Sequence, residues 1–326
     1  MTSQRSKSRW LAAAVAVFAT VGNASDKLHA QEAYPTRAVR IVVPYAAGAS
    51  TDTLGRMIGL HLETKWKQSV VVENLPGAGG LTGAAMVAKS APDGYSFVIV
   101  TASHVIAPAI MARPPFDPIK DFAAVTMLAK GPGLLIASNQ SGIQSLPDLL
   151  AKARQDQISY GSSGVGSKHH ITMLEFARIA GLNLQHVPYR GSAQAMNDIV
   201  GGHLPLQIGN MSFGFDLVRG AKAKGIAVVS THRNAIAPDI PTLTELGFPQ
   251  LSGGEWWVLL APAKTPRGII DKVAAEIAPI LKMPDVKARM PADELMSSSP
   301  EELLAFLQSE ADTWGNAAKR AGLHIE

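Results

Sequence analysis

Three loops made mostly of small residues each follow an apolar run and precede a helical pattern. They are Pro44–Asp52 (PYAAGASTD), Pro76–Gly80 (PGAGG) and Tyr160–His170 (YGSSGVGSKHH). Free backbone N–H groups at a helix N-terminus stabilise an anion through hydrogen bonds and the helix dipole. Ligands of open parallel sheets bind beyond the carboxyl ends of the strands, where these loops would lie. The loops therefore predict a site for a carboxylate or a phosphate, although any one of them alone also fits a tight turn.

Two of these loops partly match nucleotide-binding motifs, but each departs from its motif at a required position. Gly161–Gly166 has the glycine spacing of a phosphate-binding loop, but Ser167 stands where lysine is required and Lys168 where a hydroxyl residue is required. Gly77–Gly83 is one residue longer than the dinucleotide fingerprint. We therefore expect no nucleotide cofactor.

Hydrolytic and metal chemistry have weaker support. Around Ser162 and Ser163 the nucleophile-elbow pattern fails because Val165 replaces its last glycine. A cleft hydrolase stays open as an alternative, with His170 and Asp52 as candidate bases. The chain has no cysteine, and its histidines lack chelating spacing, so we expect no metal site. Arg190, after a predicted strand, is the best candidate cation for pairing with a carboxylate, and an ordinary ion pair is its alternative role.

Apolar runs and helical repeats alternate along the chain and would position these loops. Strands are predicted at 38–44, 69–73 and 95–101, with helices between them, which favours a parallel sheet. A second set of strands is expected within 134–230. The run Trp256–Ala261 is expected to return to the first sheet, followed by helices at 267–281, 284–290 and 300–321.

Length and composition agree with two α/β domains. The 326 residues are 47% hydrophobic and 17% charged, which supports a substantial core. The formal charge is +4, of which residues 1–30 carry +3, so the remainder is nearly neutral. No basic stripe remains to neutralise phosphates, and we expect no nucleic-acid partner.

The N-terminus resembles a secretory signal. Arg5, Lys7 and Arg9 precede an apolar run from Trp10 to Val21, too short to span a bilayer. Small residues at Ala24 and Ala30 offer cleavage sites, and we favour Ala30. No cysteine is present for a lipid anchor. The mature protein is expected in the periplasm.

The mature chain resembles the periplasmic solute receptors of tripartite tricarboxylate transporters, the Bug family. The resemblance rests on YPTRAVRIVVPYAAGASTD, VVVENLPGAGGLTGAAMVAKSAPDGYSFVIVT, YGSSGVGSKHH, VPYRGSAQAMNDIVGGHLPLQIGN and WWVLLAPAKTP, in that order. It implies a two-lobed periplasmic-binding-protein-like fold (type II), with two parallel-type sheets, helices on both faces and a ligand cleft between the lobes. The expected boundaries are 31–131 with 254–326 for lobe 1, and 132–253 for lobe 2.

The resemblance also implies ligand-binding positions on the loops of both lobes. In this sequence they fall on Tyr45, Ala47, Gly48, Ser50, Thr51, Asp52, Thr101, Ser103, Ser162, Ser163, Gly164, Gly166, His170, Tyr189 and Arg190.

The function that the resemblance implies is capture of a small organic carboxylate by lobe closure, without catalysis and without a cofactor. A membrane permease would receive the ligand, or a sensor kinase if the protein serves a two-component system. In HLPLQIGN, Pro205 and Gly209 replace acids that are common in the family, which favours a carboxylate lacking an amine. We expect a monomer.

Overall fold

Short β-branched and aliphatic runs form the strands of two separate sheets in the computed structural model, which describes residues 34–320. From Arg37 onward the described chain belongs to one compact unit that contains both sheets. The first sheet has the strand order β11-β4-β10-β3-β1-β2, and the second has the order β7-β6-β8-β5-β9. Among residues 34–320, no helix combines the length and the apolar character that a membrane crossing needs.

The strands of the first sheet come from both ends of the described chain. They are β1 (Val39–Val43), β2 (Val70–Asn74), β3 (Ser96–Val100), β4 (Phe122–Gly131), β10 (Glu255–Pro262) and β11 (Glu294–Leu295). The strands of the second sheet are consecutive, namely β5 (Gly133–Ser138), β6 (Ile158–Ser162), β7 (Leu184–Pro188), β8 (Leu206–Asn210) and β9 (Ala223–Val229).

Both sheets are mixed, whereas the sequence pattern predicted parallel ones. In the first sheet β1 is parallel to β2 and β3, but β10 runs antiparallel to β3 and β4. In the second sheet β6 is parallel to β7 and β8, but β5 is antiparallel to β8 and β9. In the second sheet, the reason is that β5 follows β4 without a crossover helix, so β5 runs against the direction of the β-α-β units of that sheet. In the first sheet, the strand that runs antiparallel to β3 and β4 is β10, which the chain adds on its return from the second sheet.

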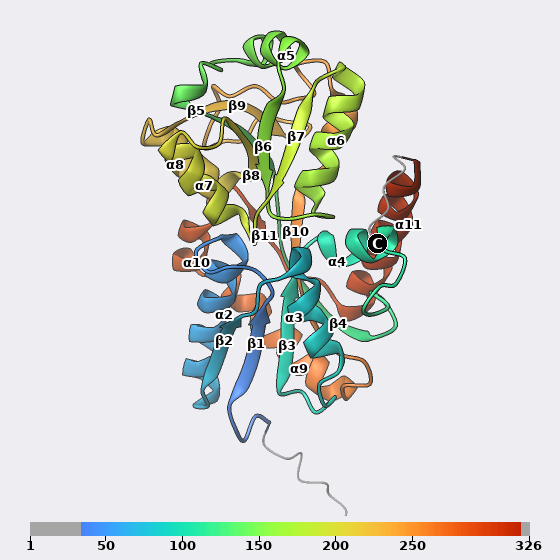
Figure 1. Ribbon diagram of the computed structural model, residues 1–326. Coiled ribbons are helices and arrows are strands. Elements are labelled where there is room, and N and C mark those ends of the chain that lie inside the picture. Colours follow the sequence, from blue (N-terminus) through green and yellow to red (C-terminus); the bar gives the residue numbers. More distant parts are fainter. Residues whose placement is uncertain (1–33, 321–326) are drawn as a thin grey trace, which may run out of the picture. The chain divides into compact units, whose positions relative to one another are not determined.

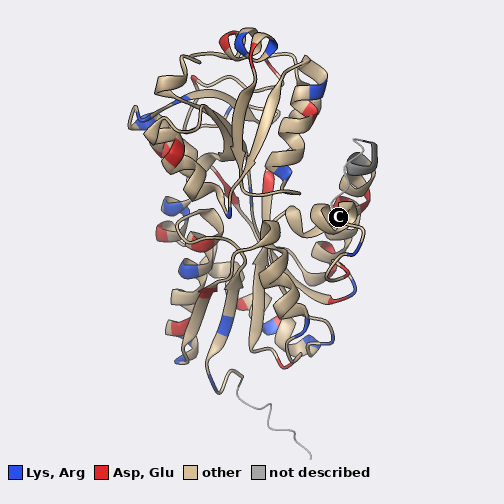
Figure 2. Cartoon of the chain, in the orientation of Figure 1, with Lys and Arg blue, Asp and Glu red and all other residues tan. Residues whose placement is uncertain are grey.

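Helices cover the sheets (Figure 1). They are α2 (Ser50–Trp66), α3 (Leu81–Ala88), α4 (Ser103–Ile110), α5 (Leu146–Gln155), α6 (Lys168–Ala180), α7 (Ser192–Gly201), α8 (Met211–Arg219), α9 (Arg267–Ile280), α10 (Pro284–Arg289) and α11 (Pro300–Arg320). The last three agree with the predicted helices to within a residue over the described part. Charged side chains of both signs lie mainly on these helices and on loops, while the strands carry few (Figure 2).

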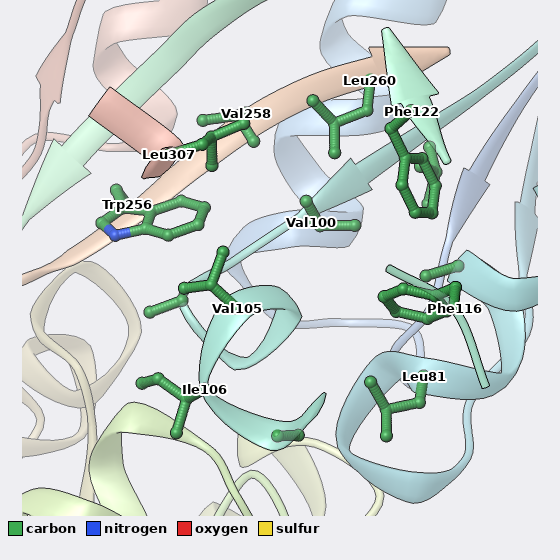
Figure 3. Close-up of a cluster of buried hydrophobic side chains, with 14 of the residues drawn as sticks. Leu81, Val100, Val105, Ile106, Phe116, Phe122, Trp256, Val258, Leu260 and Leu307 are labelled. Atoms are coloured by element: carbon green, nitrogen blue, oxygen red, sulfur yellow. The ribbon is translucent and has the colours of Figure 1, made fainter. Parts of the chain in front are cut away.

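A buried cluster fixes β10 in the first sheet (Figure 3). All eight residues of β10 are buried, and Trp256, Val258 and Leu260 pack against side chains of β3, α4 and α11. Burying one aliphatic side chain contributes about 1.5–3 kcal/mol. The strand is therefore held firmly, and the predicted return of Trp256–Ala261 to the first sheet is confirmed.

The chain passes between the sheets at two segments that touch. The first is Pro132, between β4 and β5, and the second is Gly253-Gly254, before β10. Glu255 pairs with Gly131 in the ladder of β10 and β4. A Cβ on Gly254 would lie 2.4 Å from the carbonyl oxygen of Gly131, so only glycine fits there. The expected signal segment, residues 1–30, lies outside the described residues.

Candidate functional site

A small cavity lies among the loops and helix starts of the two sheets. It measures about 20 Å³, room for roughly one water molecule, so a larger ligand needs the walls to move apart. Its lining residues are Tyr45, Ala49, Thr51, Thr101, Ser163, His169, Gly191, Ser192, Asn210 and Glu255.

Most of these residues share one feature, which is their place at or next to the N-terminus of a helix. Ala49, Gly191 and Asn210 are the N-cap residues of α2, α7 and α8. Thr101 directly precedes Ala102, the N-cap of α4, and His169 lies in the first turn of α6. Each helix start carries a partial positive charge of about half a unit. The cavity therefore combines five helix starts without a lysine or arginine among its lining residues.

The loop after β1 is held in shape by Asp52. Its carboxylate accepts hydrogen bonds from the backbone N–H of Gly48 at 3.0 Å, from Asn74 Nδ2 at 2.9 Å and from Arg56 Nε at 3.1 Å. Burial opposes the charge on Asp52, but the bonds from Arg56, Gly48 and Asn74 hold the pKa of this carboxyl below its usual value. Asp52 does not line the cavity, and its contacts make it a positioning residue for the loop.

Two hydroxyl residues of the loop after β1 line the cavity, Thr51 and Tyr45, and hydrogen bonds to neighbouring side chains hold both in place. Thr51 Oγ1 accepts a hydrogen bond from Trp257 Nε1 at 3.0 Å, which leaves the threonine proton free for another acceptor. The Tyr45 hydroxyl lies 2.9 Å from Thr101 Oγ1 and 2.8 Å from Ser103 Oγ. Burial is the main cause that raises the pKa of Tyr45 to about 12, so this phenol is a neutral hydrogen-bonding group.

Ser162 and His170 support the loop Tyr160–His170, which begins in β6. The Ser162 hydroxyl donates to the carbonyl of Gly164 at 3.1 Å and lies 2.7 Å from His186 Nε2. The His186 ring stacks on His170 at 3.9 Å, and His170 Nδ1 accepts from the N–H of Gly166. Burial lowers the pKa of His170 to about 4, so the ring is neutral near pH 7. Ser162 is fully buried and does not line the cavity, whereas its neighbour Ser163 does.

The remaining predicted positions lie around the cavity without lining it. Ser50 Oγ accepts a hydrogen bond from Asn210 Nδ2 at 3.2 Å, and Ser103 Oγ contacts the hydroxyl of Tyr45, which lines the cavity. The Tyr189 hydroxyl donates to Asp198, away from the cavity. Arg190 is exposed, and its contribution is a carbonyl that accepts from the N–H of Ala46 at 3.2 Å. Ala47 and Gly48 are exposed at the tip of their loop.

Six lining residues were not among the predicted ligand-binding positions, although Ala49 and His169 lie within two of the predicted loops. The six are Ala49, His169, Gly191, Ser192, Asn210 and Glu255. Gly191-Ser192 and Asn210 each end a strand and start a helix, which is the same signal that identified the three loops. Two of the six carry buried polar atoms without a partner among the described residues, His169 Nδ1 and Asn210 Oδ1. Such atoms are costly unless a ligand or water reaches them. Residues 34–320 contain no cluster of three metal-ligating side chains.

Comparison with known proteins settles the family. The model of the tripartite tricarboxylate transporter family receptor matches residues 54–323. The chain belongs to this receptor family.

Relatives of this receptor agree with the match. Protein BugT of Bordetella pertussis is 29% identical over 97% of this chain and 98% of its own. The structure of Rhodopseudomonas palustris Rpa4515 with adipate is 31% identical, with a TM-score of 0.85, and the match covers 89% of this chain and 99% of that one. MatC of the same organism, with bound malate, is 29% identical with a TM-score of 0.81, over 87% of this chain and 99% of that one. The two-lobed binding-protein fold predicted from the sequence is confirmed.

Proposed function

We propose that this receptor captures a small organic carboxylate in the cavity between its sheets and delivers it to a membrane transporter. The observation that carries the proposal is the meeting of five helix starts at one cavity without a cationic side chain. Backbone N–H groups and the hydroxyls of Thr51, Ser163 and Ser192 would hold the carboxylate oxygens. Adipate and malate in the two related structures are carboxylates of this kind.

Closure of two lobes on the ligand is the proposed mode of capture. Lobe 1 would comprise residues 31–131 and 254–326, and lobe 2 residues 132–253, so that Pro132 and Gly253-Gly254 form the hinge. A cavity of about 20 Å³ is smaller than any dicarboxylate, so entry requires opening. Reclosure would then exclude water and strengthen each hydrogen bond to the ligand.

Export to the periplasm through the signal at residues 1–30, and binding without turnover as a monomer, complete the proposal. The proposed binding set draws on two of the three predicted loops, Pro44–Asp52 and Tyr160–His170, and on the end of β3. Tyr45, Thr51, Thr101 and Ser163 would lie against the ligand, with Asp52, Ser162 and His170 behind them. His169, Ser192 and Asn210 join the residues against the ligand.

A thermal-shift screen of the purified protein tests the proposal. The panel holds aliphatic dicarboxylates and aromatic acids, each with its fully amidated form as a neutral control, together with acidic amino acids. A ligand at about 100 times its Kd adds roughly 2.7 kcal/mol of stability, which raises Tm by several degrees. We expect a shift with at least one acid, none with its amide, and a smaller shift in Ser163→Ala. Equal shifts with acid and amide, or a product formed from the acid on long incubation, would contradict it.

A further inference from the structure

Glu255 is a buried carboxylate at the boundary between two cavities. It is the first residue of β10 and only 5% exposed. It lines the ligand cavity and also a larger cavity of about 470 Å³ formed by the crossing segments, α11 and the loop after β9. Its Oε1 accepts from the N–H groups of Ala102 at 3.0 Å and Trp256 at 3.1 Å. These two bonds fix the carboxylate against the start of α4.

No ion pair within 4.0 Å compensates this carboxylate in the described part of the chain. The charged and titratable groups that share its two cavities or act on its charge come from six segments. They are Lys168 and His169 of α6, Glu310 of α11, Tyr45 after β1, Lys130 of β4, His232 and Arg233 after β9, and Glu294 of β11. The cation that acts on the charge of Glu255 is Lys168, whose ammonium lies 4.9 Å from the centre of the Trp314 ring. Glu255 is thus held in place by hydrogen bonds but is only partly neutralised.

Burial raises the pKa of Glu255, and Glu310 adds to that effect, while Lys168 and the two N–H bonds oppose it. His169 shares the cavity, but burial lowers its pKa to about 4, which leaves a neutral ring. Glu255 is therefore the carboxyl group of this cavity whose protonation a second negative charge would favour.

We propose that Glu255 takes up a proton when the ligand carboxylate binds, so that the receptor captures an anion and a proton together. The inference rests on the proposed function. Two carboxylates that share a small site away from water cannot both stay ionised, because each raises the proton affinity of the other. Oε1 already accepts two N–H bonds, so the new O–H bond forms at Oε2. The proton comes from the buffer acid, which becomes its conjugate base, and no other bond changes.

The affinity for a fully ionised dicarboxylate should then fall as the pH rises. Above the pKa of Glu255 in the free protein, each pH unit weakens binding by up to about tenfold, because one proton must be taken up with each ligand. Glu255→Gln keeps a neutral side chain of the same size at every pH. Its affinity should therefore be independent of pH over this range and higher than that of the wild type at the alkaline end.

Isothermal titration with adipate and with malate, from about pH 7 to about pH 9, measures the linkage, since both acids are almost fully ionised there. Titrations at each pH in two buffers of different ionisation enthalpy give the number of protons taken up. We expect the uptake in the wild type to approach one proton per ligand and to vanish in Glu255→Gln. Glu294→Gln, which removes an exposed acid that lines only the larger cavity, should keep the uptake.

Three results would overturn the inference. Binding without proton uptake in the wild type would show that Glu255 keeps its charge. Uptake that persists in Glu255→Gln would assign the proton to Lys168 or His169. Failure of every carboxylate to bind would remove the proposed function, and with it the inference.

Infrared difference spectra of the wild type provide a readout that does not depend on the folding of a variant. Binding should produce the carbonyl band of a protonated carboxyl group together with loss of a carboxylate band. Spectra without such a band across the pH range would contradict proton uptake by Glu255.

Discussion

Alanine at Gly79 should block closure of the site without touching the ligand. Gly79 has φ of +66° in the loop before α3. A Cβ there would lie 2.7 Å from the carbonyl oxygen of Val165, in the loop before α6. The Cα of Gly79 is in turn 3.2 Å from the Cβ that Gly164 would carry. These loops follow strands of different sheets, so the contact exists only while the two sheets are together.

Gly79→Ala carries two separate costs. The left-handed conformation costs alanine about 1–2 kcal/mol whether the lobes are open or closed. Overpacking against the Val165 carbonyl costs about 1–3 kcal/mol, and only in the closed form. A difference of this size in the closed form weakens ligand binding by about 5- to 150-fold.

Gly181→Ala is the matched control. Gly181 has φ of +61°, and a Cβ there meets no atom within 4 Å. Both variants should lose similar stability in urea unfolding of the ligand-free protein. Isothermal titration with a carboxylate should show weaker binding only for Gly79→Ala. Unchanged affinity in Gly79→Ala, or equal losses in both variants, would refute the assignment of this contact to the ligand-bound form.

Two further variants probe the support of the site, and a third probes Asp293, a buried acid that precedes β11 and accepts a hydrogen bond from Ser212 of α8. Thr51→Val leaves the Nε1–H of the fully buried Trp257 without its acceptor, so urea unfolding should show a loss of about 1–3 kcal/mol, and an unchanged midpoint would contradict that bond. Asp52→Asn should destabilise the protein near pH 7, and because the pKa of Asp52 is lowered by folding, the difference in Tm from the wild type should disappear as the pH falls through that lowered pKa. Burial raises the pKa of Asp293 to about 7, so its charge weakens the fold progressively from about pH 4 up to about pH 7 and fully above. Asp293→Asn should match the wild type in acid and exceed its unfolding free energy by up to about 4 kcal/mol at alkaline pH. A variant that is less stable than the wild type at alkaline pH would contradict a raised pKa of Asp293.

Local signals in the sequence were sufficient for the elements and for the loops that face the cavity. The alternation of β-branched runs with helical repeats identified β1, β2 and β3 and the last three helices. The small-residue loops indicated an anion site, because a loop that ends a strand and starts a helix has free N–H groups. The family resemblance supplied the individual positions, and of these Tyr45, Thr51, Thr101 and Ser163 line the cavity. These features depend on neighbours within a few residues, which a single sequence displays.

Features that depend on distant pairing were not predictable in the same way. The return of Trp256–Ala261 to the first sheet was predicted, but its antiparallel place between β3 and β4 was not, because that place joins residues more than a hundred positions apart. Glu255 enters the cavity only because that strand returns there, and nothing in its neighbourhood GGEWW distinguishes it from a surface acid. Asp52 lies in the expected loop, but its hydrogen bonds to Gly48 and to Asn74 of β2 are visible only in the structure, and they show that it holds the loop in shape.

Isothermal titration of the wild type with a dicarboxylate and with the matching diamide tests whether this cavity recognises the charge of a carboxylate. We expect saturable one-to-one binding of the acid, no measurable binding of the diamide, and a large loss of affinity in the double variant Thr51→Ala with Ser163→Ala. The diamide has the same length and shape but no charge, so it separates recognition of the anion by helix starts from filling of a cavity. Equal affinity for acid and diamide, or binding unaffected by the double variant, would contradict the assignment of this cavity to a carboxylate.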